Sequence, residues 1–410
     1  MSLIFIVIIS SILFAGIIMI LSLLILFVEK KVVKTGDRQI FINDETVPLL
    51  VEGGRTLLNT LRTKEIYLPS ACGGKGTCGE CKCQVVDGGG QVLPTEIGLL
   101  TRAQQKNGYR LGCQLKVRED VKLRLPVEIF SIQQFHCRVH SNRSIATFIK
   151  ELVVDLPRGE GFDFKPGQYV QIEVPMYILN YRDFHVDEKF RSDWDKYQLW
   201  DLFSENEEDV SRAYSMANYP QEKGQLKLNV RIATPPPKNI SLPTGIASSY
   251  IYGLKPGDDV VLSGPYGEFF IKETKQEMIY IGGGAGMAPL RSHLFYLLKT
   301  LKTTDRKISF WYGARSQKEI FYADEFRRLE KEFSNFSFCI ALSAPLPEDN
   351  WKGPQGFIHQ VVFDQYLKAH ADPEDIEYYL CGPPLMLAAV RNMLDNLGVP
   401  EEMIAFDSFG

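Results

Sequence analysis

Four of the eight cysteines are spaced so that their thiolates could bind iron or zinc together. Cys72, Cys78 and Cys81 share one loop in the pattern Cys-x5-Cys-x2-Cys, and Cys113 follows Cys81 by 32 positions. Zinc sites usually combine two short ligand pairs. Here three ligands lie on one loop with several glycines, whose N–H groups can turn inward toward bridging sulfide. We therefore predict a [2Fe–2S] cluster rather than zinc, with these four cysteines as its ligands.

A fifth cysteine, Cys83, lies close to this loop. Because Cys81 already completes the Cys-x2-Cys pair, we expect Cys83 to be a strand residue that points away from the cluster. The segment 36–130 resembles a plant-type ferredoxin domain, although its first spacing is one residue longer than the Cys-x4-Cys of that type. The resemblance implies a small α+β domain that holds the cluster.

A second set of residues has the chemistry to hold a flavin nucleotide. In the string Arg212-Ala-Tyr214-Ser215, arginine offers a planar fork for pyrophosphate, tyrosine a ring that can stack on a flavin, and serine a hydroxyl for a ring nitrogen. About thirty residues later, a segment from Gly245 to Ser248 opens a helical stretch, and a helix N-terminus preceded by glycine binds phosphate. Taken alone, Tyr214 would be interpreted as a packed barrel residue.

A glycine-rich turn predicts a second nucleotide site. The apolar strand Ile279–Ile281 leads into a turn with Gly284, Gly286 and Pro289 in a GxGxxP pattern. The pattern has proline where the usual dinucleotide fingerprint GxGxxG has its third glycine. Proline is compatible with this position because an N–H group at a helix start has no intrahelical partner to lose. Cys381 and Gly382 follow a later apolar strand and are candidates for the same nucleotide site. The alternative interpretation is that Cys381 is a buried, inert cysteine.

These two sets of motifs together resemble the ferredoxin-NADP reductase superfamily. The resemblance implies that FAD is bound by Arg212, Tyr214, Ser215, Gly245 and Ser248, and NADH by Gly284, Gly286, Pro289, Cys381 and Gly382. It also implies a C-terminal aromatic ring over the flavin, with Phe409 as the candidate and Phe406 as the alternative. The reacting centre would then consist of Tyr214, Ser215, Cys381 and Phe409. Arg315 is a candidate for a 2′-phosphate, so NADPH stays open beside NADH.

The N-terminus predicts a membrane anchor. From Leu3 to Val28 there are 26 residues without a charge, which as a helix would reach about 39 Å and cross a bilayer with some tilt. A cleaved signal peptide would instead need a basic start and a shorter apolar stretch. Lysines follow the run directly, so the positive-inside rule predicts a single membrane pass whose C-terminal body faces the cytoplasm. We expect this membrane to be the cell inner membrane.

The elements that must position these residues form several domains, as the length of 410 residues and roughly 150 residues per domain predict. Alternating patterns at 134–156, 169–174, 226–233 and 260–263 predict an antiparallel β-barrel, and repeated strand–helix units from 278 onward predict a doubly wound α/β sheet. We predict a membrane anchor at 1–35, the ferredoxin-like domain at 36–130, the FAD-binding barrel at 131–272 and the NADH-binding domain at 273–410.

Charge and composition restrict which classes of partner the chain can bind. The net charge of −4 lacks the basic excess that general nucleic-acid binding requires, so we expect no nucleic-acid partner. The barrel is interrupted by the aromatic and acidic segment 176–210, with 10 Asp and Glu against 4 Lys and Arg. This composition suits either a contact with a partner or a surface excursion held down by its own aromatic rings.

The order of anchor, ferredoxin, flavin barrel and nucleotide domain resembles the F subunits of sodium-translocating NADH:quinone oxidoreductases over essentially the whole chain. The resemblance implies that NADH reduces FAD, that single electrons pass to the [2Fe–2S] cluster, and that other membrane subunits carry them to quinone. The reductase component of a multicomponent oxygenase is the alternative, since it joins the same modules without an anchor. A non-catalytic redox sensor is a third hypothesis, for which one nucleotide motif should be degraded.

Overall fold

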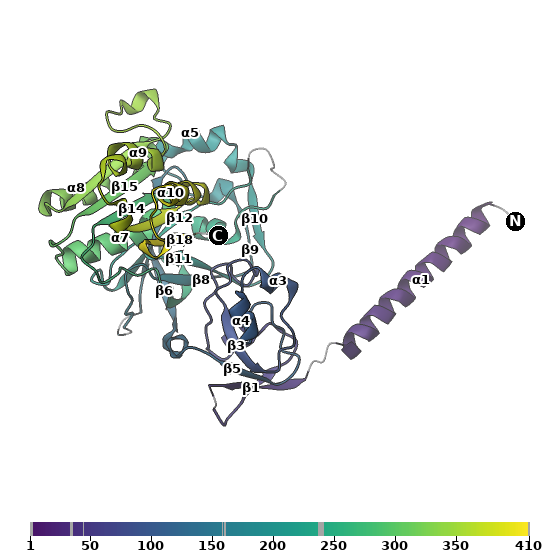
Figure 1. Ribbon diagram of the computed structural model, residues 1–410. Helices are drawn as coiled ribbons and strands as arrows, with labels where there is room; N and C mark the ends of the chain where they lie inside the picture. The colour runs from purple at the N-terminus through teal and green to yellow at the C-terminus, as the bar shows by residue number, and fades with distance from the viewer. Residues whose placement is uncertain are drawn as a thin grey trace. The chain divides into compact units, whose positions relative to one another are not determined.

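The computed structural model describes residues 3–32, 36–43, 45–157, 159, 161–236 and 242–408. The chain divides into two compact units (Figure 1). The first contains residues 1–68 and 74–131, and the second contains residues 69–73 and 132–410.

The N-terminal helix α1 spans Leu3–Val32. Large apolar side chains between Ile12 and Leu24 are exposed on it. Within the residues that the structure describes, no helix has both the length and the apolar character needed to cross a membrane. The anchor expected over residues 1–35 therefore stays a prediction.

The remainder of the first unit is built on a five-stranded mixed sheet in the order β2-β1-β5-β3-β4. The strands are β1 (Asp37–Ile42), β2 (Leu49–Glu52), β3 (Lys82–Asp87), β4 (Tyr109–Leu111) and β5 (Val121–Arg124), with helices α2 (Leu57–Arg62), α3 (Pro94–Ile97) and α4 (Arg102–Lys106). Strands β1 and β2 pair antiparallel. Thr56 caps α2 by accepting the backbone N–H of Asn59, which is the usual role of threonine at this position.

The second unit begins with an antiparallel six-stranded sheet in the order β11-β8-β13-β6-β7-β12. Its strands are β6 (Gln133–Ala146), β7 (Ile149–Asp155), β8 (Tyr169–Val174), β11 (Val210–Ser215), β12 (Gln225–Arg231) and β13 (Asp259–Tyr266), and α6 (Ile246–Gly253) packs against them. A bridge between Met216 and Leu228 joins the two ends of the sheet. The sheet thus closes into the predicted barrel around an aliphatic core.

The acidic segment 176–210 has a fold of its own. It contains β9 (Tyr177–Asn180), α5 (Glu188–Lys196) and β10 (Phe203–Asn206), and β9 and β10 form a separate two-stranded antiparallel sheet. Its central aromatic rings, Tyr181, Phe184, Phe190 and Trp194, are at most 3% exposed and pack with Phe148 and Tyr252. These four rings are therefore internal and do not form a contact surface.

The last part of the second unit is a parallel five-stranded sheet in the order β16-β15-β14-β17-β18. Its strands are β14 (Met278–Gly283), β15 (Ile308–Ala314), β16 (Phe336–Leu342), β17 (Glu377–Gly382) and β18 (Ile404–Ser408). Helices α7 (Met287–Phe295) and α8 (Ala323–Glu332) contribute to the core on one face, and α9 (Ile358–Gln365) and α10 (Pro384–Asn396) to that on the other (Figure 1). The predicted doubly wound fold is confirmed, and β18 is a fifth strand that the sequence pattern did not indicate.

The strand order fixes where a nucleotide can bind. From β14 the chain adds β15 and β16 on one side and β17 and β18 on the other. Ligands of such sheets bind at the carboxyl ends of the strands where this direction changes. That point lies between the end of β14 at Gly283 and the end of β17 at Gly382.

Candidate active site

The predicted flavin-binding string forms β11, which pairs antiparallel with β8 so that Arg212 lies opposite Ile172 and Ser215 opposite Tyr169. Ser215 is buried, whereas Arg212 and Tyr214 are partly exposed. Burial lowers the pKa of Arg212, partly opposed by Tyr214, and raises the pKa of the Tyr214 phenol. Tyr214 is therefore an uncharged ring at neutral pH, which suits stacking on a planar ring system.

The second predicted phosphate-binding segment begins α6. Gly245 is its N-cap, and a Cβ there would lie 2.5 Å from the Cβ of Ala233 and 2.7 Å from Ser248 Oγ. Ser248 Oγ donates to the carbonyl oxygen of Gly245 and accepts the backbone N–H of Ala233, both at 3.1 Å. The Ser248 hydroxyl thus fixes the shape of this turn, and only glycine fits at position 245.

The glycine-rich turn joins β14 to α7. Gly284 has a φ of +56°, which favours glycine. A Cβ on Gly286 would lie 2.1 Å from the carbonyl oxygen of Cys381, so this glycine allows the turn to approach β17 closely. Pro289 lies in the first turn of α7, where no intrahelical N–H is lost. The structure therefore places Gly284, Gly286, Cys381 and Gly382 at the point where the strand order changes.

Cys381 lies beside an acidic residue that the sequence analysis did not single out. In the parallel pairing of β17 and β18, Cys381 is opposite Asp407. Ser215 Oγ donates a hydrogen bond to Asp407 Oδ2 at 2.9 Å. Burial and the nearby Asp407 raise the pKa of the Cys381 thiol, so this cysteine is neutral. The flavin strand and the nucleotide sheet thus meet at Ser215, Cys381 and Asp407.

Of the two C-terminal aromatic residues considered for the ring over the flavin, the structure describes only Phe406. Phe409 lies outside the described residues. Phe406 is 40% exposed, and the Arg391 guanidinium lies 4.5 Å from the centroid of its ring.

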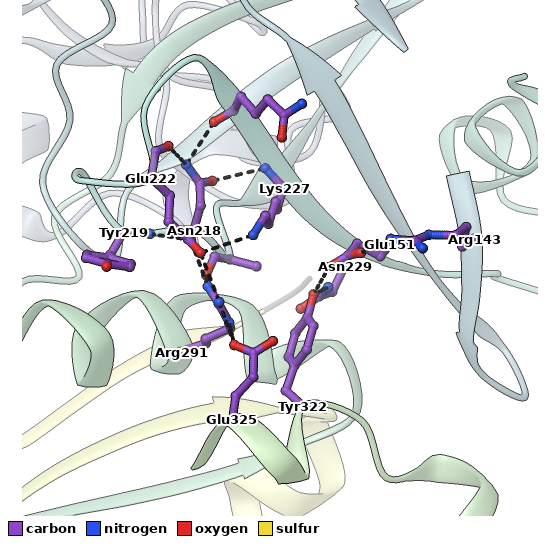
Figure 2. A network of polar contacts seen from close by, with 12 residues as sticks. Arg143, Glu151, Asn218, Tyr219, Glu222, Lys227, Asn229, Arg291, Tyr322 and Glu325 are labelled. Carbon is purple, nitrogen blue, oxygen red and sulfur yellow. Dashed lines mark hydrogen bonds and ion pairs between the residues drawn. The ribbon is translucent and has the colours of Figure 1, made fainter. Parts of the chain in front are cut away.

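A polar network joins the barrel to the helix that follows the glycine-rich turn (Figure 2). Arg291 of α7 is 2% exposed and donates to Glu222, to Glu325 of α8 and to the carbonyl oxygen of Ala217. Tyr322 contacts Glu151 and accepts a hydrogen bond from Asn229 Nδ2 at 2.9 Å. Ala217 follows Ser215 by two residues, so the network ties the flavin strand to the nucleotide helix.

In the first unit, Cys81 contacts Cys113 and interacts electrostatically with Cys78. Cys81 is 1% exposed, and hydrogen bonding with Cys113, burial and the nearby Cys78 raise the pKa of its thiol. Cys72 belongs to the segment 69–73 and is partly exposed. Among the described residues, no three Cys, His, Asp or Glu side chains converge on a position for a single metal ion. A two-iron cluster needs pairs of thiolates, and Cys81 with Cys113 forms such a pair.

The backbone near these thiols fits an inorganic cluster. Gly74, Gly76 and Gly79 all have φ between +72° and +88°, a region that side chains rarely allow. A Cβ on Gly76 would lie 2.5 Å from Gln114 Nε2. The loop is thus shaped by glycines around the cysteines, as close approach of backbone to a ligand requires.

Cys83 is buried in β3 and contributes to the sheet core. Its thiol lies 3.7 Å from the carbonyl oxygen of Arg110. Burial raises the pKa of Cys83 to about 12. Cys83 is therefore a protonated core thiol in this structure.

Three family models match the chain, in the order that the sequence predicted. A 2Fe-2S iron-sulfur cluster binding domain matches residues 40–118, an oxidoreductase FAD-binding domain matches 198–271, and an oxidoreductase NAD-binding domain matches 280–392. The predicted cofactors, FAD and a [2Fe–2S] cluster with NADH as substrate, are thus confirmed.

Solved structures share this fold at low sequence identity. The Amycolatopsis cytochrome P450 reductase GcoB has 22% identity and a TM-score of 0.63, covering 91% of this chain and 98% of its own. A ferredoxin reductase in carbazole 1,9a-dioxygenase has 24% identity and a TM-score of 0.60, covering 92% and 99%. At this identity the likeness establishes the architecture and not the reaction.

Curated relatives are much closer in sequence. The F subunit of the Na(+)-translocating NADH-quinone reductase of Idiomarina loihiensis is 52% identical over 398 residues, which is 97% of each chain. The F subunit of the same name from Klebsiella pneumoniae is 53% identical over 405 residues, 98% of this chain and 99% of its own. The chain therefore belongs to the family of Na(+)-translocating NADH-quinone reductase F subunits.

Proposed function

We propose that this chain is the electron-input subunit of a sodium-translocating NADH:quinone oxidoreductase. NADH is its electron donor, and the other subunits of the complex receive electrons from its iron–sulfur domain. The proposal is supported by the family membership and by the three matched domains.

One observation carries the proposal, namely the hydrogen bond between Ser215 Oγ and Asp407 Oδ2 at 2.9 Å. Ser215 ends the flavin strand, and Asp407 lies opposite Cys381 at the nucleotide crevice. A hydride donor and its acceptor must meet within a few ångströms, held by groups of both sites. This contact supplies such a meeting point within the second unit.

FAD, when bound, converts the electron pair of a hydride into single electrons that the [2Fe–2S] cluster can carry. We assign Arg212 to the pyrophosphate of FAD, Tyr214 to the face of its ring, and Ser215 to the ring edge. Gly245 leaves room for phosphate at α6, while Ser248 holds the turn in shape. Gly284, Gly286 and Pro289 shape the pyrophosphate turn for NADH, and Cys381 and Gly382 border its nicotinamide as a neutral, small surface.

We also propose Cys72, Cys78, Cys81 and Cys113 as the ligands of the [2Fe–2S] cluster. The contact between Cys81 and Cys113 and the glycine-lined loop support this set. Cys83 is then a core residue, in agreement with its burial in β3.

We further propose that residues 1–35 anchor the chain as a single membrane pass with the body in the cytoplasm. The uncharged run of 26 residues and the lysines after it support this topology. The partners would then be the other membrane subunits of the complex, through which this chain reduces quinone indirectly. We keep the boundaries 36–130, 131–272 and 273–410 for the three domains, which the separate sheets support.

The experiment is purification of the membrane complex through a tag on this chain, with assays of NADH oxidation and quinone reduction. The proposal expects co-purifying membrane subunits and quinone reduction that sodium stimulates. If the chain oxidises NADH but copurifies only with a soluble oxygenase, the alternative as an oxygenase reductase would replace it.

A further inference from the structure

NADH and NADPH differ only at the 2′-position of the adenosine ribose, and the loop after β15 is the part of the nucleotide domain that would lie beside this position. β14, which leads into the glycine-rich turn, pairs in parallel with β15, which ends at Ala314. In doubly wound sheets the adenosine ribose lies at the end of this neighbouring strand, where an acidic residue binds a 2′-hydroxyl or an arginine binds a 2′-phosphate. Residues 315–319 of this chain follow directly and contain both kinds of group.

The cationic side chains of this loop are already paired with carboxylates of the same chain. Arg315 Nη2 lies 3.3 Å from Glu319 Oε1. Lys318 Nζ lies 2.8 Å from Asp193 Oδ2. A backbone donor of the loop is paired too, because the N–H of Gln317 donates to Asp349 Oδ2 at 3.1 Å.

The three carboxylates come from three different elements. Glu319 ends the short helix η6 (Gln317–Glu319), Asp193 lies in α5 of the inserted segment, and Asp349 ends η7 (Pro347–Asp349). Asp349 Oδ2 also accepts the backbone N–H of Leu346 at 2.9 Å. The acidic groups are thus held around the loop from separate parts of the second unit.

Arg315 is held in place by more than its carboxylate. Its guanidinium lies 5.7 Å from the centroid of the Phe148 ring. Burial lowers the pKa of Arg315, but Glu319 and a hydrogen bond with Tyr197 of the inserted segment outweigh it and raise the pKa. A 2′-phosphate would therefore have to compete with groups that already stabilise this cation.

The two nucleotides differ in the charge that they bring to this loop. A phosphate monoester carries a charge of about −1.5 to −2 at neutral pH, so its arrival beside Glu319, Asp193 and Asp349 places like charges together. Like-charge contacts of this kind are strongly unfavourable. The 2′-hydroxyl of NADH is neutral and can donate to a carboxylate, so it meets no such repulsion.

We propose that Glu319, Asp193 and Asp349 select NADH over NADPH by neutralising the donors of the 315–319 loop and repelling a 2′-phosphate. The inserted segment 176–210 takes part in this selection because it supplies Asp193 and Tyr197. This inference rests on the proposed function, since it concerns the nucleotide site of the same reaction.

The test compares kcat/KM for NADPH and NADH in the full-length complex with an artificial electron acceptor, and competitive inhibition by 2′,5′-ADP. E319Q, D193N and D349N each keep the side-chain shape and remove one negative charge. Each should raise the NADPH-to-NADH ratio by about fivefold or more and strengthen inhibition by 2′,5′-ADP. D259N is the matched control, because Asp259 forms an exposed ion pair with Arg138 on the barrel, and should change neither.

Two further variants distinguish charge from general disturbance. K318M leaves Asp193 without its cation partner at this contact, so it should lower the NADPH-to-NADH ratio, opposite to D193N. Adding R315Q to E319Q should remove the gain, since the released Arg315 is the group expected to bind the phosphate.

The inference is overturned if E319Q, D193N and D349N all keep the parental ratio within about twofold, or if K318M moves it in the same direction as D193N. Loss of NADH oxidation by the parent complex would contradict the proposed function itself. Normal NADH oxidation with unmoved ratios would contradict this inference alone.

Discussion

Arg291 binds Glu222 through two parallel hydrogen bonds, from Nη1 to Oε2 at 3.0 Å and from Nη2 to Oε1 at 3.1 Å. Arg291 is in α7, directly after the glycine-rich turn, and Glu222 follows the flavin strand β11. A bidentate guanidinium–carboxylate pair fixes orientation as well as distance. The pair therefore holds the nucleotide helix and the flavin strand in one register.

R291K should slow NADH oxidation because lysine cannot reproduce this fork. We expect kcat/KM for NADH to fall by about tenfold, since small displacements of reacting groups are costly. The free energy of unfolding should fall by about 2 kcal/mol through lost charged hydrogen bonds. The measurements are steady-state kinetics and urea unfolding, with flavin content determined in parallel.

R327K is the matched control for this prediction. Arg327 pairs with Glu330 at 2.7 Å, but both side chains are partly exposed. The control should leave kcat/KM unchanged. A register role for Arg291 would be contradicted if R291K kept parental kcat/KM with full flavin content.

His293 should make stability depend on pH. Its side chain is fully buried, and Nε2 donates to the carbonyl oxygen of Phe269 at 2.8 Å. Burial lowers its pKa to about 4, against about 6.5 in the unfolded chain. Below pH 6.5 the unfolded state binds a proton that the folded state does not, so stability decreases as the pH is lowered, down to about pH 4.

Between pH 7 and 5 this histidine should remove about 2 kcal/mol from the free energy of unfolding. H293Q keeps a donor for Phe269 without a titrating ring, so its stability should depend less on pH in this range. Urea unfolding at several pH values measures the difference. Parallel pH curves for parent and H293Q would show that His293 does not titrate differently in the folded state.

The sequence predicted the barrel and the α/β sheet because the apolar and polar pattern of each strand is visible within a few consecutive residues. The glycines of the nucleotide turn and the cysteine loop are visible in the sequence because close backbone approach leaves no room for a Cβ. Asp407 was not identified because its role depends on the register of β18 beside Cys381, and on a contact with Ser215 across 192 positions.

The hydrogen-bond partners of Arg291 could not be predicted from the sequence either. Arg291 lies in a helix that is buried on all sides, so helical periodicity assigns it no polar partner. Its carboxylate partners are 69 and 34 positions away. The inserted segment shows the same limit, because its composition gave no indication that Asp193 pairs with Lys318.

C113A should abolish the electron paramagnetic resonance signal of the reduced cluster while FAD stays bound and reducible by NADH. Cys113 is in contact with Cys81, and a two-iron cluster needs all four thiolates. C83A is the control and should keep the signal, because Cys83 is a core residue. A signal that survives C113A and disappears in C83A would reverse the ligand assignment.

F409A should leave FAD bound but change the flavin absorption spectrum and the kinetics with NADH or NADPH. A ring stacked on the flavin contributes about 1 kcal/mol beyond its buried area, which a nicotinamide can displace. F406A is the matched variant, and Phe406 packs with Arg391. The prediction fails if both variants match the parent in spectrum and in kinetics.

Electrons from NADH should enter this chain at the flavin site and leave it through the [2Fe–2S] domain. The most direct measurement mixes NADH anaerobically with the purified complex in the parent and in C113A, and follows flavin absorption and quinone reduction together. We expect the flavin to bleach in both proteins, whereas quinone should be reduced only in the parent. Quinone reduction at the parental rate in C113A would contradict this route.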